Sequence, residues 1–186
     1  MEGWKKKRQV MQRYDLTAHL YDMRYAEEQN AKIKAALKNI NLKKNDLVLD
    51  VGCGTGLLFE YVADKTKATI GLDISEGTLL QAKRRAKNYS NVHLIHADAD
   101  HMPLKDKVFS HIFAMTFIQN TPKPIETLNE IKRVGKGNAF FVVTGLKKVF
   151  TLSRFEKLIQ GAGLKIAALY DEGLQCYVAV CSRLFH

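Results

Sequence analysis

The feature that most constrains this chain is a turn with glycines at alternate positions, Gly52, Gly54 and Gly56, directly after the apolar segment 47–51. An apolar run that meets such a turn and then an amphipathic segment is typical of a buried strand, a tight turn and a helix start. Glycine allows positive φ and close approach of a ligand. The free N–H groups of a helix start face whatever lies above the turn. The turn therefore predicts a cofactor site.

The rest of the chain alternates between strand-like and helical patterns. Residues 1–13 are rich in Lys and Arg and are expected to be a frayed basic start, followed by a helix over 14–37. Later helices are expected from about 57 to 64, after Ser75, from Pro124 to about 134, and from a capping box at Ser153 to Gly161. Strands are expected at 47–51, 68–73, 92–98, 108–115, 138–144, 164–170 and 175–182.

The short turn Asp171-Glu172-Gly173 lies between the last two expected strands, which predicts a hairpin. Parallel strands need helical crossovers, whereas a hairpin forces antiparallel pairing. The predicted fold is therefore α/β, with a doubly wound, mostly parallel sheet and helices on both faces. We expect one domain over 1–186, in which 1–40 is a basic N-terminal helical segment and 41–186 is the core.

Composition narrows the class of protein. Hydrophobic residues make up 46% of the chain and charged residues 26%, which is ordinary for a globular domain. No apolar run approaches the roughly 20 residues of a membrane span, and the basic start lacks the apolar region of a signal peptide, so a cytoplasmic location is expected. The cysteines, Cys53, Cys176 and Cys181, are odd in number and widely spaced, which argues against disulfides and against a zinc site. No metal is expected.

The chain is basic. Lys and Arg number 29 against 19 Asp and Glu, for a net charge of +10. Such a charge favours an anionic partner, such as RNA, although a generally basic proteome would produce the same balance. Local clusters of Lys and Arg favour the first interpretation; they lie at 5–8, 83–87, 132–136 and 147–148.

Acidic residues end the first three expected strands: Asp50, Asp73 and Asp98. In an open α/β sheet, ligands bind beyond the carboxyl ends of the strands. Asp73 lies 17 residues after Gly56, about the distance at which a carboxylate meets ribose hydroxyls in a strand–helix–strand unit. These positions predict a nucleoside, although three acids beside turns could also simply be solvated.

The ligand is not expected to be a dinucleotide. The spacing is GxGxG, with Leu57 where the last glycine of a GxGxxG fingerprint would stand. Asp50 would repel a pyrophosphate but suits a cation, such as the ammonium group of an amino acid. Asp98 could accept from the exocyclic amine of adenine. A nucleoside joined to a cationic amino acid is S-adenosylmethionine.

The string Asp50-Val51-Gly52-Cys53-Gly54-Thr55-Gly56, with Asp73 and Asp98 after the next two strands, resembles class I, Rossmann-like S-adenosylmethionine-dependent methyltransferases. The resemblance covers most of the chain from residue 14 and is closest in kind to small archaeal-type single-domain members, some of which use a small activator subunit. It implies the strand order 3-2-1-4-5-7-6 with an antiparallel last strand. It also implies an N-terminal helical lid, on which Tyr14 and Tyr21 close over the cofactor.

The same resemblance implies a set of cofactor-binding residues. Asp50 and Gly52 would hold the methionine end, Asp73 the ribose, and Ile74 with Asp98 and Ala99 the adenine. The full expected set is Tyr14, Tyr21, Asp50, Gly52, Cys53, Gly54, Gly56, Asp73, Ile74, Asp98, Ala99, Met115 and Thr116.

Residues for catalysis are harder to assign. The segment 114–120 lacks the Asn/Asp-Pro-Pro-Tyr/Phe loop of many amino-methyltransferases and the Pro-Cys pair of cytosine-C5 enzymes. Gln119 and Asn120 follow the fourth strand and are expected to orient a substrate, or alternatively to cap the next helix. His19 is a candidate base on the lid helix. His111 is expected to point to solvent or to a partner.

The acceptor remains open between alternatives. We expect methyl transfer to N or O of an acceptor, with RNA (tRNA or rRNA) favoured by the basic clusters. The alternatives are a small-molecule acceptor bound under the N-terminal helix near Phe117, and a non-catalytic subunit that binds cofactor or a partner.

Overall fold

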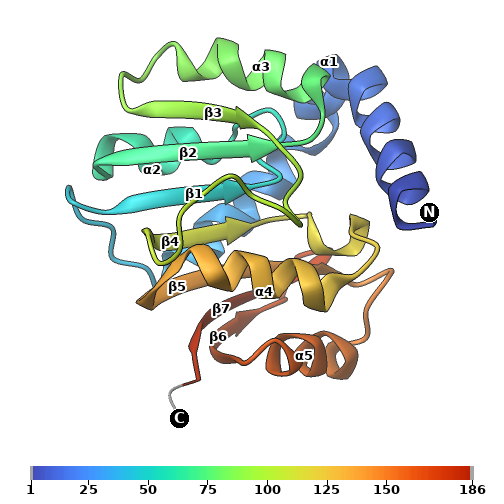
Figure 1. The fold of residues 1–186 in the computed structure, drawn as a ribbon, viewed down its shortest axis with the longest axis vertical. Coiled ribbons are helices and arrows are strands. Elements are labelled where there is room, and N and C mark those ends of the chain that lie inside the picture. Colours follow the sequence, from blue (N-terminus) through green and yellow to red (C-terminus); the bar gives the residue numbers. More distant parts are fainter. Residues whose placement is uncertain (1, 185–186) are drawn as a thin grey trace.

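The computed structural model describes residues 2–184, so the outermost residues of the expected domain lie outside the described part (Figure 1). The elements follow the alternating order expected from the sequence. They are α1 (Glu2–Leu37), β1 (Leu47–Val51), α2 (Phe59–Val62), η1 (Ala63–Lys65), β2 (Ala68–Asp73), α3 (Glu76–Ala86), β3 (Val92–His96), β4 (Phe109–Ala114), η2 (Ile118–Asn120), α4 (Pro124–Val134), β5 (Gly135–Leu146), α5 (Leu152–Gly161), β6 (Leu164–Tyr170) and β7 (Cys176–Arg183).

The strands form one seven-stranded sheet in the order β3-β2-β1-β4-β5-β7-β6. Pairing is parallel from β3 through β5, and β7 is antiparallel to both β5 and β6. The short β6–β7 connection explains this reversal, because a hairpin can only pair its strands antiparallel. The predicted fold class, strand order and antiparallel last strand are confirmed.

Helices cover both faces of the sheet (Figure 1). Alternate side chains of the central strands point to opposite sides, so β5 contributes Phe141 and Val143 to one apolar layer and Val142 to the other. The first layer packs against α4 and α5, and the second packs against α1 and α2. The carboxyl ends of β1 to β4 are thereby held at one edge of the molecule, beside the first half of α1.

The glycine turn after β1 is held between the sheet and two aromatic rings. The N–H groups of Gly52 and Cys53 both donate to Leu72 O of β2, at 2.7 and 3.0 Å. Gly52, Gly54 and Gly56 all have positive φ, of 69°, 55° and 81°. A Cβ on Gly52 would lie 2.4 Å from the Phe117 ring, and one on Gly56 would lie 2.3 Å from the Phe59 ring.

The prediction of a frayed basic start over 1–13 is wrong, because α1 is helical from Glu2 to Leu37. Two lysines fix the first turns to the body of the protein. Lys6 Nζ donates to Thr121 O at 2.8 Å, and Lys7 Nζ lies 2.6 Å from Asp98 Oδ2. Local sequence could not show these contacts, because their partners lie more than ninety residues away in the chain.

Three other boundaries differ from expectation. The helix expected over 57–64 is a single turn, α2, followed by the 3₁₀ turn η1. The fifth strand begins at Gly135 rather than 138, because Gly135 already pairs with Phe109 ahead of a register shift in β4–β5. The N-cap of α5 is Thr151, whose hydroxyl accepts from Arg154 N, and not the expected Ser153.

His111 does not point to solvent as expected. It is 5% exposed, its ring stacks on Phe140 with centroids 5.7 Å apart, and Nδ1 lies 3.7 Å from Asp46 Oδ2. Burial lowers the pKa of His111, although Asp46 opposes that shift. Because helices cover both faces of the sheet, a central strand has no solvent face for this side chain.

The glycine turn generates a matched pair of variants. Gly54→Ala adds a Cβ that meets nothing within 4 Å, so only its left-handed backbone should cost stability, about 1–2 kcal/mol of unfolding free energy. Gly56→Ala has the same backbone cost and also drives a Cβ into the buried Phe59 ring, for a total of about 2–5 kcal/mol. Urea unfolding of both variants measures the difference. Equal losses would contradict the packing of Phe59 against this turn.

Candidate functional site

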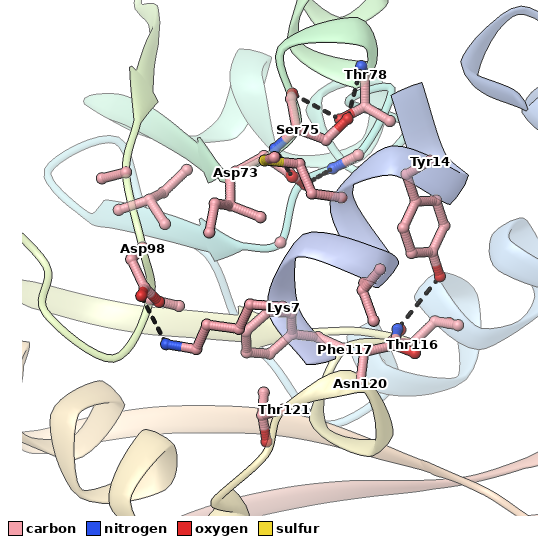
Figure 2. A pocket seen from close by; sticks show the side chains of 18 of the residues that line it. Lys7, Tyr14, Asp73, Ser75, Thr78, Asp98, Thr116, Phe117, Asn120 and Thr121 are labelled. Atoms are coloured by element: carbon pink, nitrogen blue, oxygen red, sulfur yellow. Dashed lines mark hydrogen bonds and ion pairs between the residues drawn. The ribbon is translucent and has the colours of Figure 1, made fainter. Parts of the chain in front are cut away.

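A cleft of about 790 Å³, its open mouth included, lies where the carboxyl ends of β1 to β4 meet the first half of α1. Figure 2 shows the side chains around it. A smaller cleft adjoins it, and the two share the walls formed by Tyr21, Gly52, Gly54 and Met115. Ligand sites in open α/β sheets are expected at this edge. The volume is in the range of small-ligand pockets.

The floor of the cleft is the glycine turn. Gly52 and Gly54 line both clefts, and no atom lies within 4 Å of the place where a Gly54 Cβ would be. The turn therefore offers bare backbone to a ligand, as its sequence predicted. Gly56 lies behind this surface, against Phe59, and shapes the turn without lining a cleft.

Asp73, at the end of β2, is fixed by backbone donors. Its Oδ2 accepts from Gly54 N at 2.8 Å and its Oδ1 from Ser75 N at 2.9 Å. Burial raises the pKa of Asp73, and the N–H groups of Ser75, Gly54 and Ile74 oppose that shift. Each oxygen keeps further lone pairs, so the carboxylate can accept from two vicinal hydroxyls. This is the chemistry expected of a ribose-binding acid.

Asp50, at the end of β1, is a buried acid that lacks a cation. It is 4% exposed and lines the smaller cleft, and no hydrogen bond or ion pair reaches its carboxyl group from the described residues. Burial, with a contribution from Asp73, raises the pKa of Asp50 to about 8. A buried carboxylate is stable when a cation accompanies it. An ammonium group in the smaller cleft would supply that charge.

Asp98 follows β3 and lines the larger cleft, next to Ala99. Its Oδ2 is 2.6 Å from Lys7 Nζ and its Oδ1 accepts from Asp100 N at 3.0 Å (Figure 2). Lys7 also forms an ion pair with Asp100. The carboxylates raise the pKa of Lys7 against the opposing effect of burial. An adenine amine at Asp98 would therefore share the carboxylate with Lys7.

The first half of α1 forms the roof of the larger cleft. The two Tyr-Asp pairs at 14–15 and 21–22 repeat after seven residues and therefore lie on the same side of the helix. Tyr14 and Tyr21 line the cleft, while the aspartates anchor the helix. Asp15 Oδ1 accepts from Gly77 N at 2.9 Å and from Ser75 Oγ, at the start of α3.

Asp22 makes the second anchor of α1. Its Oδ1 accepts from Thr55 Oγ1, and its Oδ2 lies 3.0 Å from an Arg85 nitrogen. Arg85 also donates to Thr55 O, so α1, α3 and the glycine turn are tied together at one point. The expected helical lid is therefore closed over the site, and its aspartates anchor it there.

The three catalytic candidates separate in the structure. Asn120 lines the larger cleft and donates to Tyr14 Oη at 3.2 Å (Figure 2). Gln119 does not line it, and its Oε1 is buried without a hydrogen-bond partner in the described part of the chain. His19 is exposed on the outer side of α1 and lines neither cleft. A base at position 19 is therefore not supported.

The other expected cofactor residues mostly lie where the sequence placed them. Ile74, Ala99, Met115 and Thr116 line the larger cleft. Cys53 lines the smaller one and is 8% exposed. Burial holds the pKa of the Cys53 thiol well above its usual value, so this group is not poised as a nucleophile.

Sequence reasoning missed three polar residues of α1 near the clefts: Lys7, Gln29 and Lys32. Gln29 and Lys32 are 8% and 2% exposed, and both contact Thr116 Oγ1 at 3.0 Å. Lys32 is buried because α1 packs across the sheet at this point.

Several residues of the expected basic surface serve the fold instead. Arg85 pairs with Asp22 and Glu60, and Arg133 with Glu130 and Asp106. Exposed cations remain on α3 at Lys83, Arg84 and Lys87. Over residues 2–184, no helix combines the length and apolar character needed to cross a bilayer. Within that same range, no group of three or more His, Cys, Asp or Glu side chains could hold a metal ion.

Comparison with known proteins agrees with this geometry. The family described as "Methyltransferase domain" matches residues 49–143. A malonyl-[acyl-carrier protein] O-methyltransferase of Marinomonas sp. is 32% identical over 144 residues, which are 76% of this chain and 53% of the relative. The chain thus spans about half the length of this curated relative.

Two solved structures show the same fold. A SAM-dependent methyltransferase of Aquifex aeolicus is 22% identical with a TM-score of 0.73, over 82% of this chain and 89% of that one. A Haloferax volcanii complex of the Trm112 methyltransferase activator with a methyltransferase matches with 18% identity and a TM-score of 0.83, over 95% and 98%. Taken with the bare glycine turn and the acids at the ends of three neighbouring strands, the family match shows that this chain belongs to the class I S-adenosylmethionine-dependent methyltransferases.

Proposed function

We propose that this protein transfers the methyl group of S-adenosylmethionine to an acceptor bound under α1. The observation that carries the proposal is the buried, unpaired Asp50 carboxyl beside Asp73 and the open backbone of Gly54. This arrangement suits a ligand with an ammonium group at one end and a ribose at the other. Residues 1–40 and 41–186 would act together as one domain, since the clefts are lined from both.

Different residues of the clefts would bind different parts of the cofactor. Asp50 would hold the ammonium group, Asp73 the ribose, and Ile74 with Ala99 the faces and edge of the adenine. When bound, the cofactor supplies a methyl group on a sulfonium, which has a good neutral leaving group. The protein therefore mainly needs to exclude water and to set the direction of approach. The closed α1 roof serves the first need.

A small or carrier-bound acceptor is favoured over RNA. Tyr14 and Tyr21 close the larger cleft, and several cations expected to bind phosphates are paired inside the protein. The Marinomonas relative is named for an acceptor on acyl-carrier protein. RNA remains the second candidate, supported by the net charge of +10 and the exposed lysines of α3.

Tritium transfer from labelled S-adenosylmethionine into fractionated cell extract tests the proposal directly. Label in the small-molecule or carrier-protein fraction is expected, and label in RNA would favour the second candidate. RNA binding should also fall steeply with rising salt, whereas binding of a neutral metabolite should hardly change. Cofactor binding by calorimetry without label in any fraction would point to a non-catalytic subunit, and no cofactor binding would contradict the proposal.

A small activator subunit is a further part of this proposal. It is supported by the fold match to the methyltransferase of the Haloferax volcanii complex with Trm112. Addition of such an activator is expected to raise the rate of methyl transfer. Full activity of the purified monomer alone would remove the reason to invoke a partner.

The ribose assignment predicts that Asp73→Ala weakens S-adenosylmethionine binding by about 1–3 kcal/mol, the scale of lost hydrogen bonds to a charged group. Calorimetry measures the change. Asp64→Ala is the matched control, because Asp64 is exposed just after α2 and lines neither cleft. An unchanged affinity in Asp73→Ala would refute the assignment.

Asp50 predicts a pH dependence of stability. Folding raises the pKa of Asp50 from 3.8 to about 8, so the folded protein binds this proton more tightly than the unfolded chain does. The free energy of unfolding is therefore highest below pH 4 and falls as the pH rises to about 8. Asp50→Asn removes this titration. The variant should therefore gain thermal stability relative to the ligand-free wild type between pH 5 and pH 8, and yet bind S-adenosylhomocysteine more weakly. Melting curves with parallel pH dependence would show that Asp50 does not titrate in this range.

A further inference from the structure

A buried polar cluster lies where the two clefts meet. It consists of Tyr21, Gln29 and Lys32 of α1 and Thr116 after β4. Gln29 Nε2 donates to Tyr21 Oη at 2.9 Å and to Thr116 Oγ1 at 3.0 Å, and Lys32 Nζ donates to Thr116 Oγ1 at 3.0 Å. Tyr21 lines both clefts, Thr116 the larger and Gln29 the smaller. The cofactor assignment above leaves Gln29 and Lys32 without a role.

Lys32 carries a positive charge that its surroundings compensate only in part. Its side chain is 3% exposed, and the nearest carboxylate oxygen, Glu28 Oε1, is 3.8 Å away. That oxygen also accepts from Gln175 N at 3.0 Å. Placing a charge in the interior is costly unless an anion or strong hydrogen bonds accompany it. A full negative charge near Thr116 would complete the compensation.

Tyr21 presents a free donor to the same place. Its oxygen accepts from Gln29, and its own hydroxyl proton has no acceptor among the described residues. Burial raises the pKa of Tyr21, so the hydroxyl keeps its proton at neutral pH. Tyr21 therefore offers an O–H donor to a ligand atom at the junction of the clefts.

Thr116 is held in a backbone conformation that a threonine rarely adopts. Its φ is 55°, and its N–H donates to Thr144 Oγ1 at 2.6 Å. Such strained residues persist where surrounding contacts hold them and cluster at functional sites. Here the contacts come from Gln29 and Lys32 on one side and from β5 on the other. The cluster is thus a part of the cleft wall that is held in place by contacts from both sides.

The clefts contain no group suited to remove a proton from an acceptor. The acids that line them are engaged with a ligand or a cation: Asp50 and Asp73 with the cofactor, and Asp98 and Asp100 with Lys7. No histidine of residues 2–184 lines either cleft. An acceptor that must lose a proton would find no base here, whereas one already ionised at neutral pH needs none.

We propose that the acceptor is a carboxylate, bound at the cluster with one oxygen on the Tyr21 hydroxyl and under the positive charge of Lys32. This inference rests on the proposed methyl transfer and specifies its substrate class. Tyr21 contacts the carboxylate. Gln29 is a positioning residue that donates to Tyr21 Oη, and Lys32 is a positioning residue that acts through Thr116. The product is a methyl ester.

The transfer balances without a proton. A lone pair on the second carboxylate oxygen forms the new bond to the methyl carbon, and the electron pair of the broken carbon–sulfur bond stays on sulfur. The negative acceptor and the positive sulfonium become a neutral ester and a neutral thioether. A site shielded from water by α1 favours this loss of charge.

Ligand-observed NMR on protein saturated with S-adenosylhomocysteine tests the charge preference. The probes are acetate, hexanoate and benzoate, each compared with its uncharged amide. At least one carboxylate should bind about tenfold or more tightly than its amide, the scale of a hydrogen bond to a charged group. If no carboxylate of the three is preferred, the inference is wrong.

Variants separate the roles within the cluster. Lys32→Met removes the buried charge and keeps an unbranched apolar chain. The nearest carboxylate, Glu28, is not left buried and unpaired, because its side chain is 24% exposed and accepts from Gln175 N. Lys32→Met should remove the preference for carboxylate over amide and leave amide binding unchanged, and Tyr21→Phe should reduce the preference. Lys34→Met is the matched control, because Lys34 is exposed on the same helix. If Lys32→Met leaves the preference intact, its charge does not act on the acceptor.

The carboxylate of the cofactor itself is the competing source of the same chemistry. Affinities for S-adenosylhomocysteine and for 5′-methylthioadenosine, which lacks the amino acid carboxylate, distinguish the two. The inference expects Lys32→Met to leave both unchanged. Weaker binding of S-adenosylhomocysteine alone would assign Lys32 to the cofactor and overturn it. Failure of wild-type protein to bind either nucleoside would instead contradict the proposed function.

Product chemistry gives an independent reading. Methyl esters release methanol in mild alkali, whereas N-methyl groups and ethers do not. Label transferred from tritiated S-adenosylmethionine to cell extract should therefore become volatile after alkaline treatment. Label that stays in RNA or in an alkali-stable product would rule out a carboxylate acceptor while leaving methyl transfer in place.

Discussion

The site depends on a turn whose glycines leave room for two aromatic rings. Phe117 packs against Gly52 and Phe59 against Gly56, and either contact would be lost if the glycine carried a Cβ. With the turn fixed from both sides, Gly54 N is aimed at Asp73 and the rest of Gly54 is open to the cleft. The absence of a Cβ at the three glycines thus allows the aromatic packing and also exposes the backbone to a ligand.

An acidic group and a basic group are buried on either side of the cleft junction. Asp50, at the end of β1, lacks a cation, and Lys32, on α1, is only partly compensated by Glu28. The first suits the ammonium end of the cofactor and the second suits an anionic acceptor. Burial without full compensation costs stability, and ligands recover that cost by supplying the missing charge. On the proposed assignments, the cofactor and the acceptor would each supply a charge that the site lacks.

Much of the fold and of the cofactor site could be predicted from the sequence because both depend on local patterns. Alternating strand and helix segments and a short connection before the last strand are sufficient for a mostly parallel sheet with one reversed strand. The acids at 50, 73 and 98 converge because carboxyl ends of neighbouring parallel strands share an edge. Two errors fall where long-range contacts decide: the helical start of α1 and the burial of His111. The N-cap at Thr151 is a local contact two residues before the expected one.

The sequence by itself determined the sheet, the glycine turn and the kind of cofactor, since spacing along single strands and turns is enough to specify them. Only the tertiary structure decided what the N-terminal helix does. Its aspartates anchor it to α3 and to the glycine turn, and its path buries Gln29 and Lys32 beside Thr116. These contacts join residues about 30 to 90 positions apart. No local pattern encodes such a meeting, because it results from how the helix packs across the finished sheet.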